Sequence, residues 1–137
     1  MKMEIHCCGC AKTVEAILTN GSEIYPKRKD LHRLPFWKCD TCANYVGCHH
    51  KTKNRTKPLG CIPTPELRKL RMQIHNLIDP LWRDLEGVSR KKVYSLMSDK
   101  LGCKFHSANM STVEEAERAL ISANEVDIEI VEALPWG

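Results

Sequence analysis

Two Cys-x-x-Cys pairs constrain the fold of this chain more than any other feature of its sequence. Cys7 pairs with Cys10 and Cys39 with Cys42, and about 30 residues separate the two pairs. This is the ligand pattern of a zinc ribbon, in which four thiolates surround one Zn²⁺ tetrahedrally. The sequence therefore predicts one structural zinc ion held by these cysteines. The alternative is four independent buried thiols.

The setting of the cysteines favours metal binding over disulfides. The first residues, Met1 to Cys7, contain no apolar segment typical of a secretion signal. No run in the chain approaches the roughly 18 apolar residues of a membrane span. We therefore expect a cytoplasmic protein that does not enter membranes. In a reducing compartment, metal ligation or burial is the expected fate of its eight cysteines.

The sequence of the N-terminal half predicts short strands around the two Cys-x-x-Cys turns, which are called knuckles below. Residues 13–18 and 22–25 flank Asn20-Gly21, a dipeptide typical of tight hairpin turns, which predicts a β-hairpin. Residues 36–38 and 44–47 predict two further strands. The segment from His49 to Gly60 is polar, basic and almost free of apolar residues, which predicts a loop.

The sequence of the second half predicts helices. Thr64-Pro65-Glu66 predicts a helix start, and Pro80 predicts a kink or break at Asp79. Ser89 and Gly102 are the expected caps of a second helix. The capping box from Ser111 to Glu114 predicts a third, with inward-facing residues that we expect to be Val113, Ala116, Leu120 and Ile121. Residues 126–130 alternate like a strand or belong to a tail.

These segments together predict a small α+β protein. Residues 1–60 form a zinc-ribbon β module with two Cys-x-x-Cys knuckles, and residues 61–137 form a packed three-helix unit with an acidic C-terminal tail. We expect Cys61 and Cys103 to be buried apolar residues and not nucleophiles.

Positive charge is concentrated in the ribbon. Residues 1–61 carry 11 Lys and Arg against 5 Asp and Glu, whereas residues 62–137 carry 10 against 12. Such asymmetry indicates a nucleic acid or an acidic protein surface as the partner, and the alternative is an ordinary solvated surface. The candidate binding residues are Lys27, Arg28, Lys29, Arg33, Lys51, Lys53, Arg55, Lys57, Arg68 and Arg71.

Histidines suggest a second candidate site. His49, His75 and His106, with Asp79, would suit a second metal ion or acid–base chemistry if the first two helices fold back on the ribbon. His75 and Asp79 are four residues apart, so the carboxylate can orient the imidazole. The alternative is structural: His75 as a hydrogen-bonded histidine and His106 as a loop residue. The spacing of these residues matches no recognised metal signature.

The chain also resembles a known family. The matching motifs include Phe36-Trp37-Lys38-Cys39-Asp40-Thr41-Cys42, Tyr45-Val46-Gly47-Cys48-His49, Pro58-Leu59-Gly60 and Asp79-Pro80-Leu81-Trp82. Through these motifs it resembles small phage and bacterial zinc-finger-containing proteins, a domain of unknown function. The resemblance implies a zinc ribbon followed by helices, encoded by a phage or prophage and working in the bacterial host cytoplasm, and it implies no established activity.

The chain departs from the family pattern at its first knuckle. The family has Cys-Pro-x-Cys there, whereas this chain has Cys7-Cys8-Gly9-Cys10, which makes Cys8 a competing ligand. Three functions remain open. The first is a zinc-stabilised accessory protein, not an enzyme, that binds nucleic acid. The others are an adaptor or inhibitor of host or anti-phage defence machinery, and a metal-dependent nuclease that uses the histidines.

Overall fold

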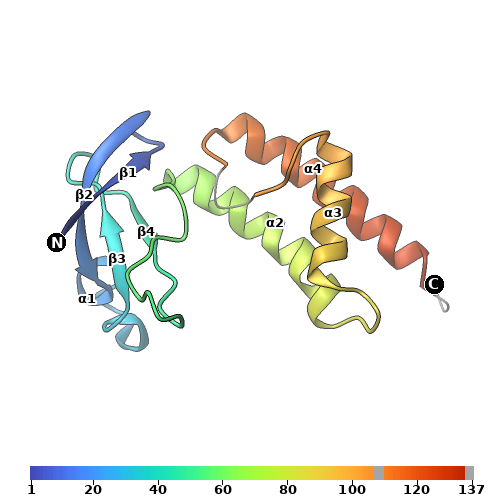
Figure 1. Cartoon of the computed structure of the whole chain (residues 1–137), viewed down its shortest axis with the longest axis horizontal. Coiled ribbons are helices and arrows are strands. Elements are labelled where there is room, and N and C mark those ends of the chain that lie inside the picture. The colour runs from blue at the N-terminus through green and yellow to red at the C-terminus, as the bar shows by residue number, and fades with distance from the viewer. Residues whose placement is uncertain (107–109, 135–137) are drawn as a thin grey trace. The chain divides into compact units, whose positions relative to one another are not determined.

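The chain forms two compact units, residues 1–65 and residues 66–137. The computed structural model describes residues 1–106 and 110–134 and is drawn in Figure 1. The first unit is built around a four-stranded antiparallel sheet, and three long helices make up most of the second, so the α+β prediction is confirmed. No helix in the described ranges is long and apolar enough to cross a membrane. The predicted division at residue 60 into separate domains stays a prediction.

The sheet follows the order of the sequence. Its strands are β1 (Lys2–Cys7), β2 (Lys12–Asn20), β3 (Pro35–Lys38) and β4 (Tyr45–Gly47), each antiparallel to its neighbours. One face carries the core of this unit, in which Trp37 is fully buried. The other core members are Ile5, Cys7, Ala16, Cys39, Val46, Cys48 and Ile62. Two predicted zinc ligands are therefore part of the core itself.

The predicted hairpin at Asn20-Gly21 is wrong. The hairpin joins β1 to β2 across the first knuckle, and Gly21 instead begins a short helix, α1 (Gly21–Ile24). Asn20 caps that helix, since its Oδ1 accepts a hydrogen bond from Ser22 N at 3.0 Å. Glycine is required at position 21 because a Cβ there would overlap the backbone carbonyl of Leu31. The dipeptide thus serves capping and close packing, not a turn with positive φ.

The register of the sheet separates the zinc knuckles from the basic loops. Asn20 pairs with Pro35 and Phe36 with Gly47, so the chain enters β3 and leaves β4 at the same end of the sheet. The loop before β3 and the loop after β4 adjoin this end, and they contain eight of the eleven Lys and Arg residues of the first unit. The knuckles follow the opposite ends of β1 and β3 (Figure 1). Metal and positive charge therefore lie at different ends of the ribbon.

The first long helix, α2 (Pro65–Arg83), runs through Pro80 without a break. Of the predicted kink or break at Asp79, the break is wrong, although Pro80 has no N–H to donate to the preceding turn, and the kink stays a prediction. Its buried residues are Leu67, Ile74, Ile78 and Leu81, whose spacing places them on one face of the helix. Asp84 N donates to the Pro80 carbonyl at 2.9 Å, so the backbone keeps its helical course past the proline.

The remaining helices are α3 (Arg90–Leu101) and α4 (Val113–Glu132), and they pack together (Figure 1). The predicted caps of α3 are confirmed. Ser89 Oγ accepts from Lys92 N at 3.1 Å, and Gly102 has a left-handed φ of 73°. In α4, Thr112 is the N-cap, and its Oγ1 accepts from Glu115 N at 3.2 Å. The strand or tail predicted at residues 126–130 is wrong, because these residues belong to α4.

The buried face of α4 also differs from the prediction. Ile121 is 61% exposed, whereas small residues fill the interface. The buried residues of this helix are Ala116, Ala119, Ser122, Ala123, Val126 and Ile130. At 100° per residue, Ile121 lies on the opposite side of the helix from these buried positions, so it faces outward.

Candidate metal centre

The four predicted cysteines meet at one point of the ribbon. Their sulfur atoms all lie within 4.8 Å of one another. Cys7 Sγ lies 3.4 Å from Cys42 Sγ, and Cys10 Sγ lies 3.7 Å from Cys39 Sγ. Four sulfurs placed tetrahedrally at Zn–S distances of about 2.3 Å would be about 3.8 Å apart. The set fits one structural zinc ion closed off by four protein ligands.

The two innermost thiols differ in acidity before metal binds. Burial raises the pKa of the Cys7 thiol to about 12. Burial also raises the pKa of Cys39, but hydrogen bonds from the backbone N–H groups of Cys42 and Thr41 outweigh it and lower that pKa to about 7. Cys39 therefore loses its proton to the incoming zinc more readily than Cys7 does. Zinc affinity consequently falls as the pH falls.

Both knuckles end in the same unusual backbone conformation. Ala11 follows Cys10 with a φ of 55°, and Ala43 follows Cys42 with a φ of 63°. These are the non-glycine residues with positive φ in the described part of the chain. Each knuckle needs this left-handed residue to redirect the chain after its second cysteine, and each uses alanine where glycine would be unstrained.

Replacing Ala43 with glycine should stabilise the ribbon. A left-handed conformation costs a non-glycine residue about 1–2 kcal/mol. The greater freedom of glycine in the unfolded chain offsets about 0.4–1 kcal/mol of this gain. We expect Ala43→Gly to raise the free energy of unfolding of the zinc-loaded protein by about 0.5–1 kcal/mol, measured by urea denaturation. Ala133→Gly is the control, because Ala133 has an ordinary φ of −82° and should gain nothing.

Comparison with protein families agrees with this geometry. A family model described as a zinc-finger-containing domain matches residues 3–124. The chain belongs to this family. No curated protein and no solved structure matches the chain. The family match covers most of the helical unit as well as the ribbon, so the zinc-finger-containing domain includes both units.

The candidate basic residues occupy different environments in this domain. Lys27, Lys29 and Arg33 are exposed before β3, and Lys51, Lys53, Arg55 and Lys57 are exposed after β4. Arg28 forms an ion pair with Asp30 at 2.8 Å. On α2, Arg68 and Arg71 are half-buried, and Arg71 donates through Nη2 to the Met110 carbonyl. Arg71 thus ties α2 to the segment before α4.

The histidine residues divide between the two units. His49 belongs to the ribbon, whereas His75 and His106 belong to the helical unit. His75 Nδ1 lies 3.2 Å from Asp79 Oδ2, and Trp82 Nε1 donates to Asp79 Oδ1 at 3.2 Å. Asp79 therefore orients His75, as the spacing predicts. Within either unit, the described residues bring together no second set of three metal-ligating side chains. The meeting of His49, His75 and His106 stays a prediction.

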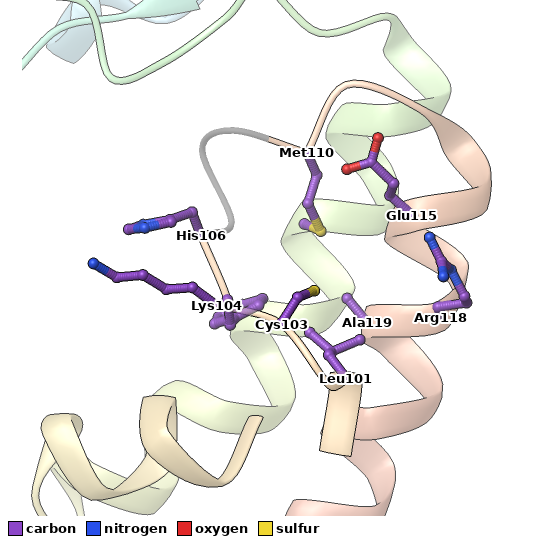
Figure 2. Close-up of a pocket in the computed structure, with 9 residues that line it drawn as sticks. Leu101, Cys103, Lys104, His106, Met110, Glu115, Arg118 and Ala119 are labelled. Carbon is purple, nitrogen blue, oxygen red and sulfur yellow. The ribbon is translucent and has the colours of Figure 1, made fainter. Parts of the chain in front are cut away.

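A cavity of about 160 Å³ adjoins His106 in the helical unit. Its lining also includes Cys103, Lys104, Glu115 and Arg118. In Figure 2 the His106 and Lys104 side chains extend to one side, while Glu115 and Arg118 project from α4 on the other. The charged groups do not converge on one point, so the cavity has no arrangement typical of catalysis. Cys103 is exposed, which corrects the expectation that it is buried.

One contact near the zinc site was not predicted from the sequence. Cys8 Sγ lies 3.6 Å from Cys61 Sγ, so Cys8 points away from the four ligands and toward the end of the ribbon. Cys61 is half-exposed, not buried. The signal in the sequence was the Cys-Cys departure from the family pattern at the first knuckle. Nothing in the spacing of the two cysteines indicated that residues 53 positions apart would meet.

Proposed function

We propose that this protein binds nucleic acid through two basic loops of its zinc ribbon, residues 27–33 and 51–57. The observation that carries the proposal is the register of β3 and β4. Because Phe36 pairs with Gly47, the loop that enters β3 and the loop that leaves β4 start from the same end of the sheet. Two basic segments that are distant in sequence thereby adjoin the same end of the sheet, which supports the proposal that they act as one positively charged region.

The charges of these loops are available to a partner. Lys27, Lys29, Lys51, Lys53 and Lys57 are all exposed. Among the ion pairs of the described residues, those of the two basic loops are confined to Arg28 with Asp30. Several cations without a nearby carboxylate repel one another, and a row of phosphates relieves that repulsion while releasing bound counterions.

The second loop is held in shape, which lowers the cost of binding. Trp37 Nε1 donates to the Thr56 carbonyl at 2.6 Å from the core of the sheet. His49 N donates to the Lys57 carbonyl at 2.9 Å, and Lys57 N donates to the Asn54 carbonyl at 3.1 Å. A loop that is already ordered loses less conformational entropy when it meets its partner.

The aromatic residues favour contact with phosphates over stacking on bases. Phe36 and Trp37 are buried in the sheet. Tyr25 and Tyr45 are half-buried, and their hydroxyl groups are hydrogen-bonded to each other at 2.6 Å. The proposed binding therefore reads the charge of the backbone and not the base sequence. This part of the proposal departs from single-strand binders that stack bases on exposed rings.

The setting that the family resemblance implies belongs to the same proposal. We place the protein in a phage or prophage, acting in the cytoplasm of the bacterial host as an accessory protein. The same charged loops would also fit an acidic protein surface, as in an adaptor that blocks a defence system. The nuclease hypothesis requires a metal ion in addition to the ribbon zinc. Both alternatives are outcomes of the following test.

Neutralising the second loop should weaken binding and flatten its salt dependence. The variant replaces Lys51, Lys53, Arg55 and Lys57 with glutamine. Each lost phosphate contact lowers the slope of log affinity against log salt by about 0.9. We expect the slope to fall by about 3 and the affinity at moderate salt to fall about 100-fold. Fluorescence anisotropy with labelled duplex and single-stranded oligonucleotides of mixed sequence measures both quantities.

A matched variant controls for net charge. It replaces Lys69, Lys91, Lys92 and Lys104 with glutamine, which are exposed residues of the helical unit. Its affinity should stay within about threefold of the parent protein. Equal loss in both variants, or a parent protein without salt dependence, would overturn the proposal. A stable protein partner captured from nuclease-treated extract favours the adaptor, and Mg²⁺-dependent nicking that His75→Ala abolishes favours the nuclease.

A further inference from the structure

Two cysteines outside the zinc site lie in contact within the ribbon. Cys8 occupies the first knuckle between two zinc ligands, and Cys61 lies at the end of the ribbon, 53 residues later. Their sulfur atoms are 3.6 Å apart. Neither belongs to the four-thiolate set, and neither has a role in the proposed binding of nucleic acid.

The backbone brings the two cysteines together. Cys8 N donates to the Ile62 carbonyl at 2.8 Å, and Ile62 N donates to the His6 carbonyl at 2.9 Å. These bonds form a parallel bridge between Cys7 and Ile62, and Ile62 is fully buried. The contact between the sulfurs therefore rests on main-chain hydrogen bonds and a core residue, not on the placement of two exposed side chains.

The two thiols are more accessible than the buried zinc ligands. Cys8 and Cys61 are half-exposed, as are the ligands Cys10 and Cys42, whereas Cys7 and Cys39 are buried. Zinc further protects its ligands because a coordinated thiolate is a weaker nucleophile than a free one. A small oxidant in solution would thus reach the pair before it reaches Cys7 or Cys39.

We propose that Cys8 and Cys61 form a reversible disulfide while the zinc remains bound. The oxidant is a low-molecular-weight disulfide such as oxidised glutathione. The sulfur of one cysteine attacks it, which forms a mixed disulfide and releases one glutathione with the proton. The sulfur of the second cysteine then attacks the first, releasing a second glutathione with the second proton. Two electrons pass from the protein to the oxidant.

The disulfide needs little rearrangement and has a definite effect on the ribbon. Bond formation brings the sulfurs from 3.6 Å to about 2.05 Å. The new bond closes a covalent ring between the first knuckle and the segment around Ile62. This ring restrains the strand end that carries Cys7, and we expect it to slow loss of zinc to a chelator by about tenfold or more.

The test uses the full-length, zinc-loaded protein with Cys103→Ser, so that the exposed Cys103 cannot react. Oxidised glutathione is added, remaining thiols are alkylated, and peptides are identified by mass spectrometry. We expect a Cys8–Cys61 cross-linked peptide, loss of two alkylated thiols and retention of one zinc per chain. Cys8→Ser and Cys61→Ser should each abolish the cross-link, keep the zinc, and lose the slowing of zinc release. Dithiothreitol should restore both thiols.

Three results would overturn the inference. One is a glutathione adduct that persists on Cys8 or Cys61 without forming the cross-link. Another is oxidation that first joins Cys7, Cys10, Cys39 or Cys42 and releases the zinc. The third is a second zinc per chain that both Cys8→Ser and Cys61→Ser remove, which would assign the pair to metal binding instead. None of these results depends on whether the protein binds nucleic acid.

Discussion

Removal of zinc should unfold the sheet of residues 1–65 and leave α3 and α4 helical. Cys7 and Cys39 belong to the core of the ribbon, so the metal links the two knuckles through that core. Structural zinc contributes about 10–16 kcal/mol of apparent binding free energy at neutral pH, and small metal modules unfold without it. We expect amide hydrogens of β1 to β4 to lose protection on chelation, while those of the helical unit keep most of theirs.

A single ligand substitution should have the same effect as chelation. Cys39→Ser removes the thiol whose pKa the knuckle lowers to about 7, and it should reduce bound zinc from one ion per chain to a small fraction. Cys103→Ser is the control, because Cys103 is exposed and distant in sequence from the knuckles. Elemental analysis and hydrogen exchange together check the result. Full protection of the sheet in metal-free protein would show that the apolar core suffices and that the zinc is not structural.

The zinc site was predictable because its determinants are local. A Cys-x-x-Cys pair places two thiolates on one tight knuckle whatever the rest of the fold does, so two pairs define a ligand set. The basic loops were also visible as runs of charge. Their common end of the sheet was not predictable, because it depends on the register between β3 and β4. The same applies to the contact between Cys8 and Cys61, which needs the bridge at Ile62.

The predictions of secondary structure were wrong where one sequence pattern is compatible with two structures. Val126 and Ile130 are four residues apart and buried, while Ile128 between them is 55% exposed. This alternation suits a strand, but the same residues also fall on one helix face together with Ala119 and Ala123. The helical spacing of the buried residues, which extends from Ala116 to Ile130, favours a helix. At Asn20-Gly21 a turn signal served as a helix cap, because tertiary packing at Leu31 demanded the glycine.

Truncation of Trp37 should be the most damaging core substitution in the ribbon. Trp37 is fully buried on β3, opposite Leu18 on one neighbouring strand and Val46 on the other. Removal of a buried tryptophan side chain typically costs about 3–5 kcal/mol. We expect Trp37→Ala to lower the free energy of unfolding of the zinc-loaded protein by that amount in urea denaturation. Trp82→Ala, in the helical unit, should leave the protection of the sheet unchanged.

Trp37→Phe separates the packing role of this residue from its hydrogen bond. Phenylalanine keeps much of the apolar contact but cannot donate to the Thr56 carbonyl, and an unpaired, partly buried carbonyl costs about 1–3 kcal/mol. If the indole orders the second basic loop, amide exchange of residues 48–58 should quicken and nucleic-acid affinity should fall, while the zinc content stays at one ion. Unchanged exchange would assign the order of that loop to its backbone bonds at His49 and Lys57. Faster exchange together with weaker binding would show that the affinity of the loop for a phosphate backbone depends on its anchoring to the ribbon core as well as on its charge.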